Sequence, residues 1–200
     1  MPSMTLRDQL RSNASRFFEQ PVARLLRAVG LSPNAVTLLG LAVTAVAGHF
    51  ASRGLFLWAG LTLLVASAMD MLDGALARLT GKANKFGAAL DSVVDRVAEA
   101  VVLLGVLMHF VRTGDNPGAY LAFGATVASF MVSYIRARGE GLGVTMKESG
   151  LVTRTERVVV MVAGLLTGWV TVAVVIVFVT SVFSALQRMY HIWKGTKEGP

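Results

Sequence analysis

Residues 70–95 read DMLDGALARLTGKANKFGAALDSVVD, a stretch that joins two apolar segments of the chain. Its first two aspartates are three positions apart and its last two are four apart, so each pair shares one face of an α-helix. The connection over residues 80–85 is short, which makes the two helices antiparallel neighbours. We therefore expect four carboxylates to converge, those of Asp70, Asp73, Asp91 and Asp95.

The composition of the whole chain indicates that these helices lie in a membrane. Of its 200 residues 54% are hydrophobic and 16% are charged, and the mean hydropathy is +0.61. A water-soluble domain of this length needs more charged residues to cover its surface. Membrane lipid is therefore the expected surrounding and partner, and nucleic acid is not. The absence of cysteine excludes disulfides and thiolate chemistry.

Six apolar stretches divide most of the chain into candidate membrane spans. They are residues 36–52, 55–77, 86–111, 117–135, 155–168 and 169–193. Each of the first four can cross a hydrocarbon core about 30 Å thick as a helix. The run from 158 to 186 is nearly continuous, and a single tilted helix is an alternative there. Two spans broken near Gly168 are favoured, because Gly164, Thr167 and Gly168 are candidate turn residues.

The placement of basic residues favours six spans over five. With six spans, both termini and the loops over 78–85 and 136–157 share one side, which holds 17 of the 19 Lys and Arg residues. Only Arg53 and Arg112 lie opposite. The positive-inside rule then places both termini and the aspartates at the cytoplasmic face of the cell membrane. Five spans would leave the basic C-terminus outside.

The N-terminal residues 1–27 lack the uninterrupted apolar core and the cleavage site of a secretory signal peptide. Leucines and phenylalanines alternate there with arginines, a pattern typical of a helix that lies on the membrane surface and contacts anionic headgroups. A soluble N-terminal arm is the alternative. We predict an all-α integral membrane protein, with an amphipathic interfacial helix in residues 1–30 followed by one domain of six transmembrane helices over 31–200.

Four ionised carboxylates that face one another near a membrane require compensating positive charge. Oxygen ligands without a neighbouring His or Cys favour Mg²⁺ or Mn²⁺ over zinc. Two such ions held by four aspartates suit phosphoryl chemistry, in which the ions bind phosphate oxygens. Gly74 and Ala77 leave room for a ligand beside the first pair, and Arg78 can neutralise a second phosphate.

Two other interpretations of the aspartates stay open. They can form helix-end salt bridges with Arg78, Lys82 and Arg96, although this explains one or two of them rather than four. They can also mark the path of a cation or proton transporter, as intramembrane carboxylates do. The position of the carboxylates near one membrane face, and the lack of inverted repeats and paired broken helices in the sequence, favour an enzyme.

The same stretch resembles the signature of the CDP-alcohol phosphatidyltransferase family, D-x-x-D-G-x-x-A-R, eight residues, then G-x-x-x-D-x-x-x-D. All eight fixed positions match, at Asp70, Asp73, Gly74, Ala77, Arg78, Gly87, Asp91 and Asp95. The resemblance covers most of the chain, since family members have six helices preceded by an amphipathic one. It implies a phospholipid-synthesising transferase and a homodimer.

The resemblance also implies a mechanism with two divalent metal ions, Mg²⁺ or Mn²⁺. The diphosphate of a CDP-linked lipid binds the metals, an acceptor hydroxyl attacks the lipid-side phosphorus, and CMP leaves. By position, Asp70, Asp73 and Asp91 match the metal ligands of the family. Asp95 matches the general base, which can also contact one metal.

A second segment of the chain, residues 31–37, resembles the entry of the family into its first span. By that match Asn34 and Thr37 help to hold the nucleotide. A purely local interpretation is a helix start, with Ser32 as N-cap and Pro33 at the first position, and both can be true. Asn84 lies where relatives contact the CDP moiety, and Gly74, Ala77, Arg78 and Gly87 complete the predicted site for the CDP-lipid.

The acceptor is predicted from arginines on three other segments. They resemble those of prokaryotic phosphatidylinositol phosphate synthases, although Arg136 stands where lysine is expected and the last interhelical loop is unusually short. By that resemblance, Arg136, Arg138 and Arg188 bind the phosphate of inositol phosphate, and Arg154 and Arg157 line its approach. Each arginine alone is better explained as a positive-inside anchor, but several arginines from three helices at the depth of the aspartates indicate an anionic pocket.

The acceptor and the donor each have an alternative. A phosphatidylglycerophosphate synthase, with glycerol phosphate as acceptor, is the closest competitor, because its acceptor is also phosphorylated. A serine or choline transferase fits less well, because its acceptor brings no phosphate for these arginines. The donor is CDP-diacylglycerol or a CDP-ether lipid.

Overall fold

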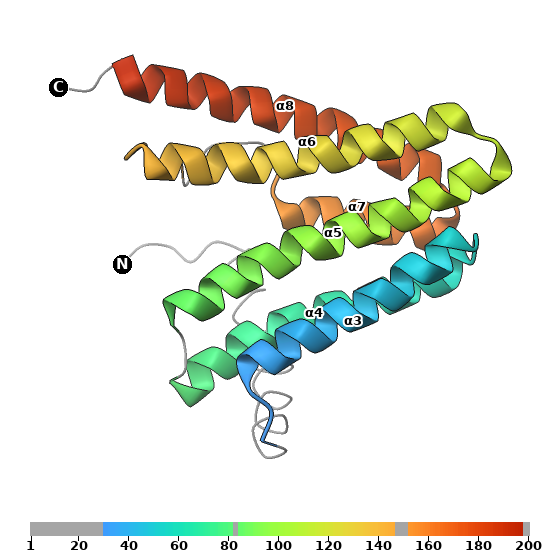
Figure 1. Ribbon diagram of the computed structural model, residues 1–200, viewed down its shortest axis with the longest axis horizontal. Helices are drawn as coiled ribbons and strands as arrows, with labels where there is room; N and C mark the ends of the chain where they lie inside the picture. Colours follow the sequence, from blue (N-terminus) through green and yellow to red (C-terminus); the bar gives the residue numbers. More distant parts are fainter. Residues whose placement is uncertain (1–29, 82–83, 147–151, 198–200) are drawn as a thin grey trace, which may run out of the picture. The chain divides into compact units, whose positions relative to one another are not determined.

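The computed structural model describes residues 30–81, 84–146 and 152–197, and no strand occurs among them. These residues form six helices (Figure 1). They are α3 (Pro33–Ser52), α4 (Phe56–Thr80), α5 (Lys85–Thr113), α6 (Asn116–Gly141), α7 (Arg154–Thr167) and α8 (Val170–Lys197). The predicted all-α class is confirmed. The predicted amphipathic helix at the N-terminus lies outside the described residues.

Four of the described helices are long and apolar enough to cross a membrane, namely α3, α4, α6 and α8. The other two differ for physical reasons. α5 has 29 residues, but its first half carries Asp91, Asp95 and Arg96, followed by Glu99. α7 has 14 residues, so it extends over about 21 Å, less than a hydrocarbon core about 30 Å thick.

Two helix boundaries lie where local signals in the sequence predicted them. Ser32 precedes α3, and its Oγ accepts a hydrogen bond from the Ala35 N–H at 3.2 Å, as an N-cap does. The break near Gly168 is also confirmed, since α7 ends at Thr167 and α8 begins at Val170. Gly168 has a φ of +79°, a left-handed conformation that glycine adopts without steric cost.

The chain divides into two compact units. Among the described residues, the first unit comprises 30–43, 64–81 and 84–97, and the second comprises 44–63, 98–146 and 152–197. In the first unit, the buried side chains of Val36, Ala75 and Leu76 pack the start of α3 against α4. This packing places the beginning of α3 beside the part of α4 that carries the first aspartate pair.

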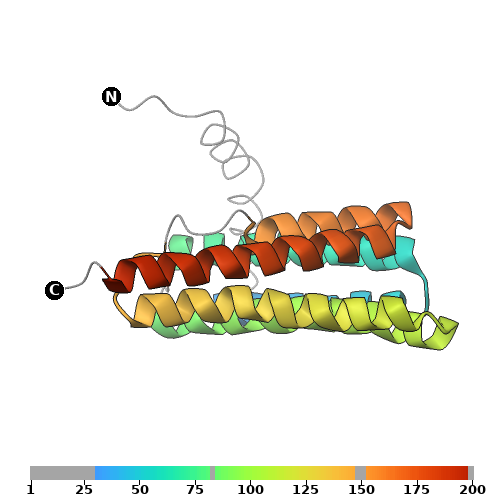
Figure 2. The ribbon, with the colours of Figure 1, turned by 90° about the horizontal axis from the view of Figure 1, so that it is seen from above.

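The second unit has a large apolar core, and small residues bring some of its helices into close contact. A Cβ at Gly105 in α5 would overlap the carbonyl of Gly48 in α3, so the two backbones lie in direct contact. α6 and α8 lie side by side in both views (Figures 1 and 2) and run in the same direction. Their contact buries Ser129 against Ser181, whose hydroxyls are 3.4 Å apart.

Candidate active site

The aspartates of the first unit come from two consecutive helices. α4 carries Asp70 and Asp73 in its second half and ends at Thr80, and α5 begins at Lys85. Asn84 precedes α5, and its Oδ1 accepts a hydrogen bond from the Gly87 N–H at 2.7 Å. This local cap starts the helix that carries the second aspartate pair.

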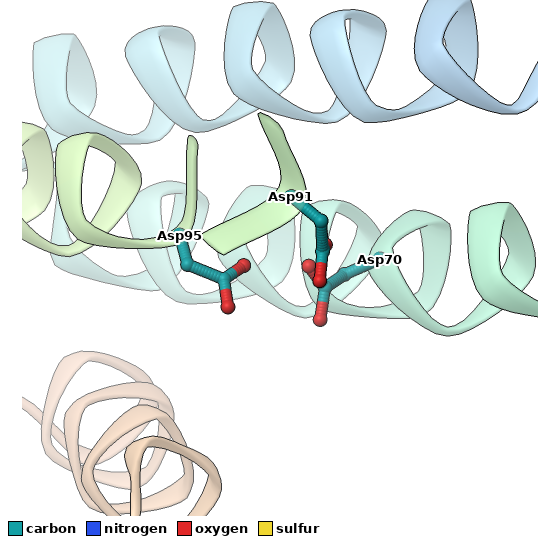
Figure 3. A group of neighbouring side chains, drawn as sticks. All are labelled: Asp70, Asp91 and Asp95. Atoms are coloured by element: carbon teal, nitrogen blue, oxygen red, sulfur yellow. The ribbon is translucent and has the colours of Figure 1, made fainter. Parts of the chain in front are cut away.

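Three of the four predicted metal ligands form one group. Asp70, Asp91 and Asp95 each offer a carboxylate oxygen, and these oxygens lie within 4.8 Å of one another. Figure 3 shows Asp91 and Asp95 projecting from α5, with the carboxylate of Asp91 next to that of Asp70 from α4. All three side chains are half-buried. Three converging carboxylates with no His or Cys among them suit a hard divalent cation such as Mg²⁺ or Mn²⁺.

The fourth aspartate, Asp73, has a different environment. It is 6% exposed, and the Thr37 hydroxyl from α3 donates a hydrogen bond to its Oδ2 at 2.6 Å. Asp73 is not part of the group formed by the other three carboxylates. The hydroxyl holds the Asp73 carboxylate in one orientation, the role that outer-shell partners have at metal sites.

A cavity of about 230 Å³ opens beside Asp73 in the first unit. All seven residues predicted to bind the CDP-lipid line it, together with Asp73 and Asp91: Asn34, Thr37, Gly74, Ala77, Arg78, Asn84 and Gly87. A Cβ on Gly87 would lie 3.4 Å from the Oδ1 atoms of both Asn34 and Asn84. Glycine at this position therefore leaves the cavity open between two amide side chains.

One ion pair of the salt-bridge interpretation is present in the first unit, and Lys82 lies outside the described residues. Arg96 Nη1 lies 4.0 Å from Asp95 Oδ2, at the outer limit of an ion pair, and it also donates to the Ser92 carbonyl. Such a pair accounts for one of the four aspartates. It leaves the convergence of the other carboxylates unexplained.

The five arginines predicted to bind the acceptor lie in the second unit, in three kinds of environment. Arg136 and Arg138 are exposed near the end of α6, where Arg136 Nε pairs with Glu140 Oε1 at 3.0 Å. Arg154 is half-buried at the start of α7. Arg188 of α8 is 5% exposed, and its Nη1 donates to the Val132 carbonyl of α6 at 2.7 Å.

Arg157, the fifth, is buried in an ion pair that the sequence analysis did not predict. Its Nε and Nη2 donate to the two carboxylate oxygens of Glu99, at 2.6 and 2.9 Å. Glu99 follows Asp95 by four positions in α5, continuing the acidic spacing of Asp91 and Asp95. The position of Glu99, an acidic residue within the apolar stretch 86–111, was the signal in the sequence that could have identified this residue as part of an ion pair.

Comparison with known proteins shows that the chain is similar to enzymes of one family. The CDP-alcohol phosphatidyltransferase family profile matches residues 30–193. An archaetidylinositol phosphate synthase of Pyrococcus horikoshii is 34% identical over 90% of this chain and 95% of its own length. A phosphatidylinositol phosphate synthase of Corynebacterium glutamicum is 36% identical over 85% of this chain and 81% of its own.

Solved structures show the same relationship. A Mycobacterium tuberculosis phosphatidylinositol phosphate synthase with CDP-DAG bound matches with a TM-score of 0.81 and 29% identity, over 88% of this chain and 94% of that one. The same enzyme in complex with manganese and citrate matches with a TM-score of 0.80 and 30% identity, over 86% of this chain and 88% of that one.

Proposed function

Because the chain belongs to the CDP-alcohol phosphatidyltransferase family, we propose that it transfers a phosphatidyl group from a CDP-lipid to a hydroxyl of inositol phosphate, with release of CMP. The observation that carries this proposal is the cavity of the first unit. Its lining contains every residue of the predicted CDP-lipid site, next to two of the motif aspartates.

Each group of the motif has a distinct task in this proposal. Asp70, Asp91 and Asp95, which converge, would hold two divalent ions, Mg²⁺ or Mn²⁺, together with Asp73, which shares α4 with Asp70. When bound, the ions would supply charge stabilisation at the phosphate oxygens. Asp95 accepts the proton of the acceptor hydroxyl as its oxygen attacks the lipid-side phosphorus. The bond from that phosphorus to the bridging oxygen breaks, and Arg78 neutralises charge on the departing CMP.

The acceptor assignment depends on the arginines of the second unit. Arg136, Arg138 and Arg188 bind the acceptor phosphate in this proposal, and Arg154 and Arg157 line the approach. The relatives whose names specify an inositol phosphate product support this choice. The donor is CDP-diacylglycerol or its ether-linked counterpart, since the relatives include both phosphatidyl and archaetidyl synthases.

The membrane arrangement is part of the same proposal. α5 and α7 cross the bilayer together with the four more apolar helices, giving one domain over residues 31–200 behind an interfacial helix within 1–30. Both termini and the site face the cytoplasm of the cell, and two copies form a homodimer. The distribution of Lys and Arg supports this orientation, and the family membership supports the helix number.

The decisive experiment measures CMP release by the purified protein with Mg²⁺. Inositol phosphate, glycerol phosphate, free inositol and serine are offered in parallel, each with CDP-diacylglycerol and with a CDP-ether lipid. Release with inositol phosphate alone is the expected result. Release with glycerol phosphate instead would support transfer from the CDP-lipid but refute inositol phosphate as the acceptor. No release with any combination would refute the proposed transferase activity. Cation-driven flux in liposomes would then test the transporter alternative.

A further inference from the structure

The pair formed by Arg157 and Glu99 has a geometry that fixes a guanidinium in one orientation. Arg157 is 2% exposed and Glu99 has a side chain 10% exposed, so both charges are largely removed from solvent. Two parallel hydrogen bonds join them, from Nε to Oε1 and from Nη2 to Oε2. This two-pronged contact restricts rotation of the guanidinium much more than a single hydrogen bond does.

The pair leaves the Nη1 nitrogen of the guanidinium without a hydrogen-bond partner in the part of the chain that the structure describes. Arginine has five N–H donors, and Glu99 occupies the edge formed by Nε and one side of Nη2. Nη1 is buried and has no hydrogen-bond partner among the residues that the structure describes. A buried donor in this state costs free energy that an incoming oxygen atom would recover. The edge that carries Nη1 matches the spacing of two phosphate oxygens.

The local sequence explains how this edge is presented. The Glu156 carboxylate accepts a hydrogen bond from the Thr153 N–H at 2.8 Å, which sets the start of α7 and places Arg157 in its first turn. Glu99 reaches Arg157 from the middle of α5. Two elements of the second unit therefore determine the position of one guanidinium.

We propose that Glu99 is a positioning residue for the acceptor: it holds Arg157 so that the Nη1 edge receives an oxygen of the acceptor phosphate. This inference rests on the proposed function, because it requires a phosphorylated acceptor. Glu99 itself touches neither substrate. Its contribution is to neutralise part of the buried charge and to keep the donor pointed in one direction before the acceptor arrives.

The test is a kinetic comparison of Glu99→Gln with the unaltered protein, with the concentration of each substrate varied separately. The uncharged amide weakens the hydrogen bonds that orient Arg157. The KM for inositol phosphate therefore rises about tenfold, the size expected for the loss of one charge-assisted hydrogen bond. The KM for CDP-diacylglycerol stays within twofold. Inositol phosphate alone also raises the unfolding temperature of the unaltered protein more than that of the variant.

Two further variants serve as a matched control and as a substitute in case Glu99→Gln does not fold. Asp115→Asn is the matched control, because it also converts a carboxylate of the second unit to an amide, while asparagine caps α6 as well as aspartate does. Its acceptor KM is expected to be unchanged. If Glu99→Gln does not fold, Glu99→Asp retains the charge and displaces it by one methylene, and a severalfold rise in acceptor KM is expected.

The possible results distinguish a failure of the role of Glu99 from a failure of the proposed transferase function. An unchanged acceptor KM in a folded Glu99 variant, with lower stability alone, would make the pair purely structural and overturn the proposal. An equal rise in both KM values would overturn it as well. Absence of CMP release by the unaltered protein with every phosphorylated acceptor would refute the proposed function itself.

Discussion

The acidic region of the first unit and the basic region of the second unit handle charge in opposite ways. Asp70, Asp91 and Asp95 bring like charges to within 4.8 Å of one another, an arrangement that calls for a cation from outside the chain. In the basic region, Arg157 binds Glu99 and Arg188 binds the Val132 carbonyl. The converging carboxylates therefore favour an added cation, whereas the two buried arginines neutralise or satisfy part of their charge within the second unit.

The largest effect is expected from Asp91→Asn, which tests the dependence of the acidic region on a cation. Loss of one carboxylate from the group lowers kcat by about 10²–10³-fold, comparable to loss of one transition-state contact in other enzymes. Removal of Mg²⁺ with EDTA abolishes CMP release by the unaltered protein, and added Mg²⁺ or Mn²⁺ restores it. CMP assays and calorimetric Mg²⁺ titrations measure both results. Full activity of Asp91→Asn would show that the acidic region does not require a cation.

Arg188→Gln tests the basic region and should have the next largest effect. The change removes a buried charge, so the KM for inositol phosphate rises about 10–100-fold, as expected for loss of one or two charged hydrogen bonds. The matched control is Arg112→Gln, because Arg112 also donates to a backbone carbonyl, that of Ser52 at 3.3 Å, in the same unit. Equal acceptor KM values for the two variants would contradict a role for Arg188 in binding.

Thr37→Val tests the buried hydrogen bond from the Thr37 hydroxyl to Asp73 in the acidic region. Valine has nearly the shape of threonine but cannot donate to Asp73, so the Mg²⁺ concentration for half-maximal rate rises about tenfold or more, as for other outer-shell substitutions. Thr126→Val serves as control, since the Thr126 hydroxyl donates to the Ala122 carbonyl within α6. A raised KM for CDP-lipid with unchanged Mg²⁺ dependence would instead support the nucleotide contact predicted from the sequence.

The smallest effect is expected from Gly87→Ala. The added methyl group would lie 3.4 Å from the Oδ1 atoms of Asn34 and Asn84, a contact that small shifts can accommodate. The KM for CDP-lipid therefore rises about two- to fivefold, consistent with a packing change of less than about 1 kcal/mol. Gly141→Ala in α6 is the control, because a Cβ there meets no atom within 4 Å. Equal KM values would show that Gly87 does not shape the cavity.

The sequence was most informative for features that depend on residues close together in the chain. The helix pair around residues 80–85, the start of α3 at Pro33 and the break at Gly168 were all predicted, because each depends on neighbouring residues. Four of the predicted CDP-lipid residues that line the cavity belong to the aspartate motif, namely Gly74, Ala77, Arg78 and Gly87, whereas Asn34 and Thr37 come from the separate segment 31–37. The local cap that Asn84 provides for α5 was not anticipated, although a short-range rule describes it.

Contacts between distant segments could not be predicted from spacing. The hydrogen bond from Thr37 to Asp73 joins residues 36 positions apart, and the pair of Arg157 and Glu99 joins residues 58 apart. Each depends on how two helices pack, which a helical period does not specify. Helical spacing therefore did not distinguish Asp73 from Asp70 and Asp91, whereas in the structure Asp73 lies outside the group formed by Asp70, Asp91 and Asp95.

The tight turn at Gly168 has a consequence for how the chain acquires its structure. Only Gly168 and Trp169 separate α7 from α8, and Gly164 lies so close to Ala173 that a Cβ there would overlap it. The loop that must close before this contact forms is short, so its entropic cost is low. Local contacts of this kind form quickly. α7 and α8 thus constitute a hairpin that can assemble early in synthesis, from contacts between neighbouring parts of the chain.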